Sequence, residues 1–389
     1  MKSVNNYEEF ANKSLCIVGS GESASDMILA AAKFGRQAYL SIRKDHGFLV
    51  PRYIHGNEYG PADLDTSRVH HSIPRAWGVL HTYMDMLNSL IKSYIYSLLF
   101  QGGHATESDR IRRTGIWMNL SQIPTNHICN TFGTKNYNLV EALVKYPEKC
   151  HRKPAIKQLK EKSVIFEDGS EEAIDEIICC TGFQISFPYL DQTDPILKQL
   201  SIEARKAHGL YKHCIHPDYP SDIYFIGFAR PALGAVPPLI ELQARWCALL
   251  ASNRLRLPPK SQMIKEIDHY CKYLRRQFPS TRIDRLTSLT DYLIYSDDLA
   301  RSIGCRPNFR QILFTDPYLW LKLMCGPLLN AHYRLTGPHA QPERARSIIL
   351  KAKWVKQPNI LYSIMLFIYL LFWSIFGIES CKPASWYPL

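Results

Sequence analysis

The chain has 389 residues, of which 46% are hydrophobic, and it carries a formal net charge of +12. This length predicts two lobes, and the apolar fraction excludes a disordered protein. A basic balance often indicates a nucleic-acid-binding protein, but no helix-turn-helix, zinc-finger or RNP-like segment accompanies it here. We therefore expect no nucleic-acid partner. An anionic cofactor or an anionic membrane surface accounts for the charge equally well.

The first elements are predicted to be a strand, a glycine turn, a helix and a second strand. Apolar runs at Leu15–Val18 and Ala38–Ile42 predict two parallel strands. Between them, Gly19, Gly21 and Ala24 have the G-x-G-x-x-A spacing of a dinucleotide-binding turn. The first glycine makes the turn, the second lets the backbone approach a pyrophosphate, and the alanine lets helix and strand pack closely. The alternative is a glycine turn in an ordinary α/β core.

The end of the second strand indicates which dinucleotide would bind. An NAD site usually places Asp or Glu there, whereas this chain has Ser41, Arg43 and Lys44. Arg and Lys attract a 2′-phosphate that a carboxylate would repel, so the sequence favours NADP(H) over NAD(H). The alternative for Arg43 is a solvated surface charge.

The middle of the chain is predicted to mix helices with a hairpin. We expect an amphipathic helix at about Ala76–Leu99, a polar loop at about Gly102–Thr114 and a helix at Tyr137–Tyr146. Two short segments, Ile156–Leu159 and Ser163–Glu167, form a predicted hairpin-like pair.

A further apolar strand is expected at Ala173–Cys180, and it ends in Thr181 and Gly182. A small pair of residues after a strand lets the backbone lie close to a cofactor or a neighbouring domain. Farther along the chain, we predict a strand at Ile223–Gly227, then a loop rich in Gly and Pro, and a helix at Leu239–Leu250.

Cysteine usage and the terminal segments bear on location. The 11 Cys include no C-x-x-C pair, which favours reduced thiols of an intracellular protein, and no metal-ligand spacing is present. The N-terminus has no signal-peptide core. Ile360–Gly377 carries no charge and is close to the length needed to span a bilayer. We expect a tail anchor or a helix embedded in one leaflet; the alternative is a buried terminal helix.

These segments together resemble the flavin-containing monooxygenases, class B flavoproteins of the dimethylaniline monooxygenase type. Glu241–Trp246 matches the family's Glu-Leu-Gln-Ala-Arg-Trp, and Gly19–Asp26 resembles its NADP-binding glycine motif. The other similar blocks are Ser41–Arg43, Thr181–Phe183, Asp291–Asn308, Thr315–Pro317 and Tyr333–Pro338. The resemblance extends over nearly the whole chain.

The resemblance implies both a fold and a chemistry. The fold would be α/β, with a Rossmann-like NADP-binding domain, a partial FAD-domain lobe and a C-terminal hydrophobic helix. The activity would be FAD- and NADPH-dependent monooxygenation by O2, in which a hydroperoxyflavin oxygenates the nitrogen of an amine or the sulfur of a sulfide. The location would be the endoplasmic reticulum membrane, reached through the C-terminal segment.

The resemblance also assigns roles to residues of the nucleotide turn. The backbone at Ser20–Ala24, with the Ser23 side chain, would hold the pyrophosphate. Arg43, helped by Ser41 and Lys44, would bind the 2′-phosphate.

Other roles concern the flavin. The loop and helix start from Gly234 to Gln243 would face the flavin ring, with a helix-surface or capping role as the alternative for Gln243. For Arg245 and Trp246, packing between lobes is favoured over a catalytic role. No catalytic side chain is assigned. The predicted cofactor-binding residues are Gly19, Ser20, Gly21, Glu22, Ser23, Ala24, Ser41, Arg43, Lys44, Thr181, Gly182, Gly234 and Gln243.

The chain departs from the family at its beginning. Two family segments are missing from this sequence: the FAD-binding glycine motif, and a Phe-x-Gly-x-x-x-His-type segment before the NADP motif. We expect an NADP(H)-binding domain at 1–180, a returning part of the FAD lobe at 181–259, a helical region at 260–357 and a membrane-associating segment at 358–380. Two hypotheses compete with an active monooxygenase. One is an NADP(H)-binding pseudoenzyme, and the other is a truncated or split chain whose flavin lobe comes from a partner chain.

Overall fold

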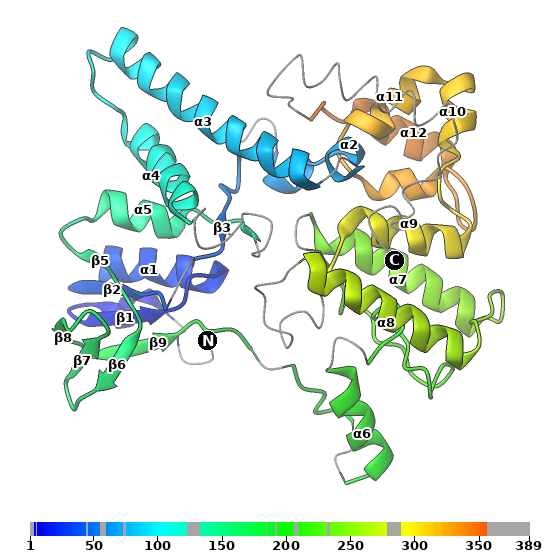
Figure 1. Cartoon of the computed structure of the whole chain (residues 1–389), viewed down its shortest axis with the longest axis horizontal. Coiled ribbons are helices and arrows are strands. Elements are labelled where there is room, and N and C mark those ends of the chain that lie inside the picture. Colours follow the sequence, from blue (N-terminus) through cyan, green and yellow to red (C-terminus); the bar gives the residue numbers. More distant parts are fainter. Residues whose placement is uncertain are drawn as a thin grey trace. The chain divides into compact units, whose positions relative to one another are not determined.

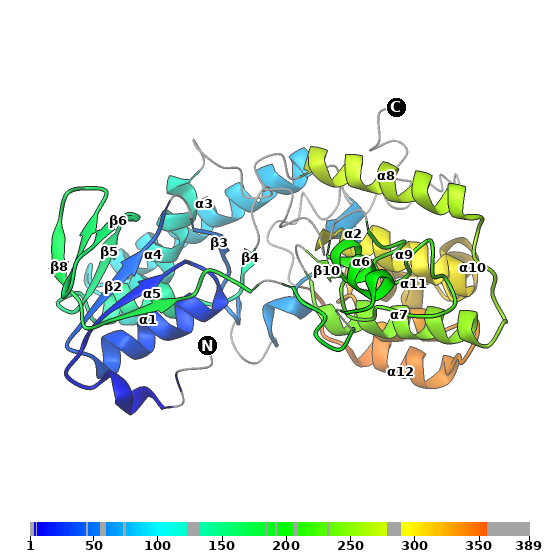
Figure 2. The same ribbon diagram turned by 90° about the horizontal axis from the view of Figure 1, so that it is seen from below.

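The computed structural model describes residues 4, 6–43, 46–54, 60–72, 75–122, 133–183, 185–190, 193–205, 209–231, 234–277 and 289–355, with 72 and 75–81 described by their backbone alone. The chain folds as two compact units (Figure 1; Figure 2). The first comprises Met1–Ile54 and Val79–Gln184, and the second His55–Gly78 and Ile185–Leu389. Lys44 and the predicted hydrophobic segment 358–380 lie outside the described residues. In the part that is described, no helix combines the length and the apolar character needed to cross a membrane.

A four-stranded parallel sheet forms the centre of the first unit. Its order is β5 (Cys150–Lys153), β2 (Gln37–Ser41), β1 (Ser14–Val18) and β9 (Glu176–Cys179). All three neighbouring pairs are parallel. The predicted mixed α/β class with a parallel sheet is therefore confirmed.

Side chains of β1 alternate between the two faces of this sheet. Leu15 and Ile17 pack with α1 (Glu22–Phe34) and α5 (Asn138–Lys145), whereas Cys16 faces the opposite side. That opposite side is covered by an antiparallel sheet of β6 (Ile156–Leu159), β7 (Ser163–Phe166) and β8 (Glu171–Ala173) (Figure 1). The first unit thus has three layers, and the predicted hairpin is confirmed.

Two predictions for the first unit were wrong. The expected strand at Ala173–Cys180 is split, because Ala173 pairs with Ser163 in the hairpin sheet while Glu176 begins a strand beside β1. The expected loop at 102–114 contains the start of α4 (Glu107–Ser121). Thr106 and Asp109 form a capping box at that helix start, which satisfies backbone N–H groups that would otherwise lack partners.

The long helix predicted before α4 is present as α3 (Arg75–Phe100).

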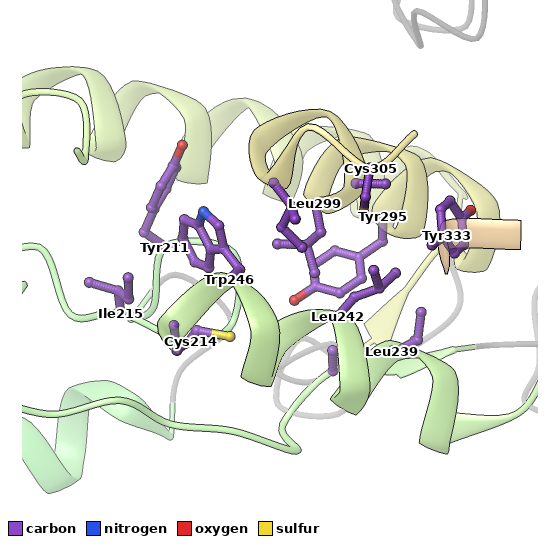
Figure 3. Packing of buried hydrophobic residues seen from close by; sticks show 14 of the residues in the cluster. Tyr211, Cys214, Ile215, Leu239, Leu242, Trp246, Tyr295, Leu299, Cys305 and Tyr333 are labelled. Carbon is purple, nitrogen blue, oxygen red and sulfur yellow. The ribbon is translucent and has the colours of Figure 1, made fainter. Parts of the chain in front are cut away.

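The second unit is mainly helical. Three of its helices are α7 (Val236–Ala251), α8 (Lys260–Gln277) and α9 (Tyr292–Ile303). Figure 3 shows Trp246 of α7 and Tyr295 of α9 in the cluster that fills the core of this unit. In the described part of the chain the other elements are η1 (Tyr7–Phe10), β3 (Phe48–Leu49), η3 (Ala62–Leu64), α2 (Arg68–Ser72), β4 (Gly133–Thr134), α6 (Pro195–Ala204), β10 (Arg230–Pro231), β11 (Leu289–Thr290), α10 (Phe309–Thr315), α11 (Pro317–Cys325), η6 (Asn330–Arg334) and α12 (Pro342–Lys351).

Two details of the second unit differ from the sequence prediction. The strand expected at Ile223–Gly227 is reduced to an isolated bridge between Ile215 and Tyr224. The N–H of Phe225 still donates to the carbonyl oxygen of Cys214, but the N–H of Gly227 donates to the Gln243 side chain. Helix α7 begins at Val236, before the predicted start. Its first turn accommodates two prolines, since the first N–H groups of a helix need no intrahelical partner.

Candidate functional site

Gly19 closes the turn between β1 and α1. Its φ is +123°, and a Cβ at this position would lie 2.5 Å from the carbonyl oxygen of Cys180. Its own N–H donates to the carbonyl oxygen of Ser41 at 3.0 Å. Gly19 therefore lies where the ends of β1, β2 and β9 meet, and only glycine fits this approach.

Gly21 has a different setting, although it belongs to the same motif. It is the N-cap of α1 with a φ of −83°, and no side chain caps the helix. A Cβ built on Gly21 would meet nothing within 4 Å. The fold itself therefore does not require glycine here. What glycine provides is open space directly before the N–H groups of a helix start, a position that favours an anion.

The neighbours of Gly21 hold the first turn of α1 in place. Ser20 and Ser23 are half-buried, and Ala24 is fully buried against the sheet. The carboxylate of Glu22 accepts a hydrogen bond from the backbone N–H of Lys135 at 2.6 Å. Glu22 is thus bonded to the chain segment that precedes α5.

A second set of hydrogen bonds between α1 and this segment was not predicted from the sequence. The Nδ2 atoms of Asn136 and Asn138 each donate to Oδ1 of Asp26 at 2.8 Å. These bonds fix the start of α5 and the loop before it to the second turn of α1. The signal available in the sequence was an Asn-Tyr-Asn segment at the start of a predicted helix.

At the end of β2, the two described residues of the predicted phosphate site have different environments. Ser41 is 2% exposed, and its hydroxyl donates to the carbonyl oxygen of Pro154 at 2.8 Å. The Ser41 hydroxyl thus links the end of β2 to the residue that follows β5. Arg43 is exposed, and among the described residues its side chain has no hydrogen-bond or ion-pair partner. Lys44 lies outside the described residues.

The end of β9 reaches the same edge of the sheet. Thr181 and Gly182 follow β9 after Cys180 and are exposed, and Gly182 has a φ of +97° with open space around it. In a parallel sheet the carboxyl ends of the strands share one edge, where open α/β sheets bind their ligands. The structure therefore brings Gly19, Gly21 and Arg43 to this edge together with Thr181 and Gly182.

The two predicted residues of the second unit are closely packed. A Cβ on Gly234, whose φ is +110°, would lie 2.6 Å from the ring of Tyr292. Gln243 is fully buried, its Oε1 accepts from the N–H of Gly227 at 2.9 Å, and its Nε2 donates to the hydroxyl of Tyr295 at 2.7 Å. The Gln243 side chain therefore lies in the core, neither on the helix surface nor at a helix cap.

The rest of the Glu-Leu-Gln-Ala-Arg-Trp segment is used in the same way. Arg245 donates to the carbonyl oxygens of Tyr333 at 2.9 Å and Pro338 at 3.1 Å. Glu241 accepts from Arg334 at 2.6 Å, and Trp246 is 3% exposed within the core cluster. These side chains fasten α7 to the segment 333–338 inside the second unit.

The second unit also contains a buried cluster of charged residues that their spacing in the sequence did not predict. Oδ2 of Asp297 accepts from Arg68 at 2.7 Å and from Arg306 at 3.1 Å, and Oδ1 accepts from the hydroxyl of Tyr333 at 2.8 Å. Burial alone would raise the pKa of Asp297, but the two guanidinium groups outweigh that effect and lower the pKa to about 2. The cluster joins α2, α9 and η6 within the unit.

A family profile described as flavin-binding monooxygenase-like matches residues 118–361, which is more than half of the chain. The chain belongs to this family. The sequence prediction of a flavin-containing monooxygenase relative is thus confirmed at the level of the family.

This family member is 30% identical over 353 residues to 4-hydroxybenzoate brominase (decarboxylating) of Pseudoalteromonas luteoviolacea, covering 89% of this chain and 62% of that protein. It is 31% identical over 350 residues to dimethylaniline monooxygenase (N-oxide-forming) 2 of Rattus norvegicus, covering 88% of this chain and 58% of that protein. The chain therefore spans less than two thirds of the length of these relatives.

Among solved structures, cyclohexanone monooxygenase from Rhodococcus sp. Phi1 bound to NADP+ covers 78% of this family member and 66% of its own chain, at 13% identity and a TM-score of 0.44.

Proposed function

We propose that this chain binds NADPH at the glycine turn and takes part in an FAD-dependent monooxygenase reaction on the nitrogen of an amine or the sulfur of a sulfide. Membership of the flavin-binding monooxygenase-like family supports the reaction class. The observation that carries the nucleotide part is Gly21: the fold leaves space at an uncapped helix start where no steric demand calls for glycine.

Each part of the dinucleotide has a counterpart at this edge of the sheet. The pyrophosphate would lie before the first N–H groups of α1, at Ser20–Ala24. The guanidinium of Arg43, exposed and without a described partner, would bind the 2′-phosphate as a charge-assisted hydrogen-bond donor. Ser41 would act indirectly, by fixing the strand end that carries Arg43. Thr181 and Gly182 would lie along the dinucleotide.

For FAD, the residues that the resemblance assigned do not fit. When bound, FAD would supply the oxygen-activating redox chemistry of such an enzyme. Gly234 is packed against Tyr292, and both ends of the Gln243 amide are bonded to the protein core. We therefore assign no flavin contact to these two residues and derive no step through the flavin.

The same observation favours a second candidate function. A chain that binds NADP(H) but holds no flavin would be a nucleotide-binding module, without turnover of its own or completed by a partner chain. Two experiments address the nucleotide site and the flavin separately.

The first experiment tests the nucleotide site by isothermal titration of NADP+ and NAD+. Arg43→Gln should weaken NADP+ binding about 10- to 100-fold, because one hydrogen bond to a charged group is lost, and should leave NAD+ binding unchanged. Arg52→Gln removes another exposed arginine of the same unit and serves as the matched control. Equal losses for both nucleotides, or no loss, would contradict the assignment of Arg43.

The second experiment is a visible absorbance spectrum after incubation of the full chain with FAD and removal of free flavin. A stoichiometric flavin band that NADPH bleaches supports the monooxygenase. A folded chain that binds NADP+ but retains no flavin supports the nucleotide-binding module and removes independent catalysis.

A further inference from the structure

The second unit contains a pocket that none of the predicted nucleotide or flavin residues lines. Its volume is about 460 Å³, and it lies between the turn Leu210–His213, helix α8 and helix α9. This volume is within the range of sites that bind small organic molecules.

Aromatic side chains form much of the pocket wall. Tyr211 and His213 come from the turn, Tyr270 from α8 and Tyr295 from α9. The ring of His213 stands edge-on to those of Tyr270 and Tyr295, with centroids 5.7 Å away in both cases. Walls of this kind pack well against a planar ring, which gains from stacked and edge-to-face contacts.

The turn is held in an unusual backbone conformation. Lys212 and His213 are consecutive residues with φ values of +47° and +55°, in the left-handed region that non-glycine residues rarely adopt. The hydroxyl of Tyr295 donates to the carbonyl oxygen of Lys212 at 2.6 Å and accepts from Gln243 at 2.7 Å. Strained backbone that buried groups hold in place is typical of binding sites. Figure 3 shows Tyr295 extending from α9 toward α7, where Gln243 is located.

The carboxylates that line the pocket already have partners. Glu266 accepts from the hydroxyl of Tyr211 at 2.8 Å and from Gln262 at 3.0 Å. Asp298 forms an ion pair with Lys212. Neither carboxylate therefore needs a cation from a ligand.

Two cations of the lining have no such partner. Lys265 on α8 and Arg301 on α9 are exposed, and in the described part of the chain neither forms a hydrogen bond or ion pair through its side chain. With Lys212 they make three cationic side chains against two carboxylates. The lining therefore has an excess of positive charge at two groups that are able to donate to an anion.

We propose that this pocket binds a small organic anion with a planar aromatic body, with its ring between the aromatic walls and its acidic group at Lys265 and Arg301. The site belongs to the second unit and takes a ligand other than the dinucleotide of the glycine turn. The proposal does not depend on the proposed monooxygenase function.

The test uses 4-fluorobenzoate as the probe and ¹⁹F NMR on the full chain. We expect saturable line broadening with 4-fluorobenzoate and at least tenfold weaker binding of 4-fluorobenzamide, which has the same shape without the charge. The double variant Lys265→Gln/Arg301→Gln should also weaken 4-fluorobenzoate binding at least tenfold. Its control, Lys272→Gln/Arg310→Gln, removes one lysine of α8 and one arginine of α10 that do not line the pocket.

Several outcomes would overturn the proposal. Absence of broadening at millimolar probe removes the site, and equal binding of the amide removes the anionic ligand class. Equal losses in both double variants would assign the effect to overall charge. If NADP+ displaces the probe and Arg43→Gln abolishes its binding, the probe occupies the nucleotide site instead. Far-ultraviolet circular dichroism of each variant establishes that it is folded.

Discussion

The glycine turn of the first unit and the Glu-Leu-Gln-Ala-Arg-Trp segment of the second both carry the family resemblance, yet their polar groups are used differently. At the glycine turn, the helix start is uncapped and Arg43 has no described partner. In the α7 segment, Gln243 and Arg245 are bonded to groups within their own unit. A motif match alone does not separate ligand contacts from packing, whereas hydrogen-bond partners do.

The largest effect is expected at the most enclosed charges of the second unit. Asp297→Asn removes the carboxylate charge between Arg68 and Arg306, which would leave two guanidinium groups without their counter-ion. Because Asp297 and Arg68 are 1% and 2% exposed, we expect a loss of about 3–5 kcal/mol in the free energy of unfolding. Urea unfolding at pH 7 measures it.

The matched control is Asp218→Asn. Asp218 pairs with Lys260 in the same unit, but both side chains are about half exposed, so the expected loss is about 0–1 kcal/mol. Similar losses in the two variants would show that the buried cluster contributes no more than a surface pair. NADP+ affinity of the folded Asp297→Asn variant should equal that of the wild type, because the glycine turn belongs to the other unit.

His332 predicts a pH dependence in the same core. Burial, with the charge of Arg68, lowers its pKa from 6.5 to about 3. Below pH 6.5 His332 is protonated in the unfolded chain but stays neutral in the folded chain. The free energy of unfolding therefore falls as the pH falls from 6.5 toward 3. Between pH 7 and 4 this amounts to about 3 kcal/mol. The loss over this interval should be smaller by that amount in His332→Leu and unchanged in His104→Leu, which alters an exposed histidine.

An effect of about 2–3 kcal/mol is expected for Gly19→Ala in the first unit. The variant combines left-handed strain with a Cβ placed 2.5 Å from the Cys180 carbonyl oxygen. Gly169→Ala is its control, since Gly169 also has a positive φ but open space around it. Thermal melts of the two variants separate strain from collision. Equal melting temperatures would mean that the ends of β1 and β9 do not approach as closely as described.

Much of the first unit followed from local patterns. β1, β2 and α5 were predicted because their apolar residues repeat with the period of a strand or a helix over a short window. Helix α4 was missed because its start depends on the reciprocal bonds of Thr106 and Asp109 within a polar segment. The segment Ile223–Gly227 was predicted as a strand from its apolar residues, but it forms only an isolated bridge at Tyr224, and the N–H of Gly227 donates to a side chain from α7.

For the candidate site, too, local features were predicted from the sequence and long-range contacts were not. The sequence placed Gly19, Gly21 and Arg43 at one sheet edge because strand–turn–helix geometry is local. It could not predict that Gln243 lies buried between Gly227 and Tyr295, or that Arg68 meets Asp297, because these contacts join residues far apart in the chain. The long-range partners of polar groups were the missing information.

Gln243→Met tests the packing half of the comparison. The variant keeps the volume but leaves the N–H of Gly227 without its acceptor, so we expect a loss of about 2 kcal/mol in unfolding free energy. Gln311→Met, on an exposed face of α10, should cost little and serves as the control. If Gln243→Met left stability intact but changed flavin retention or NADPH-dependent bleaching, Gln243 would be a ligand contact after all.

Gly21→Ala tests the ligand half, and it has the smallest effect on the fold. A φ of −83° suits alanine, and the added Cβ meets nothing within 4 Å, so the free energy of unfolding should stay within about 1 kcal/mol of the wild type. NADP+ affinity should nevertheless fall at least tenfold, about 1.4 kcal/mol, because the methyl group would occupy the space before the α1 start where the pyrophosphate is proposed to lie. Titration and thermal melting of the same sample measure both quantities. Unchanged affinity in Gly21→Ala would mean that the nucleotide does not use the open space at the helix start. The glycine turn would then be no more a ligand site than the Glu-Leu-Gln-Ala-Arg-Trp segment of α7.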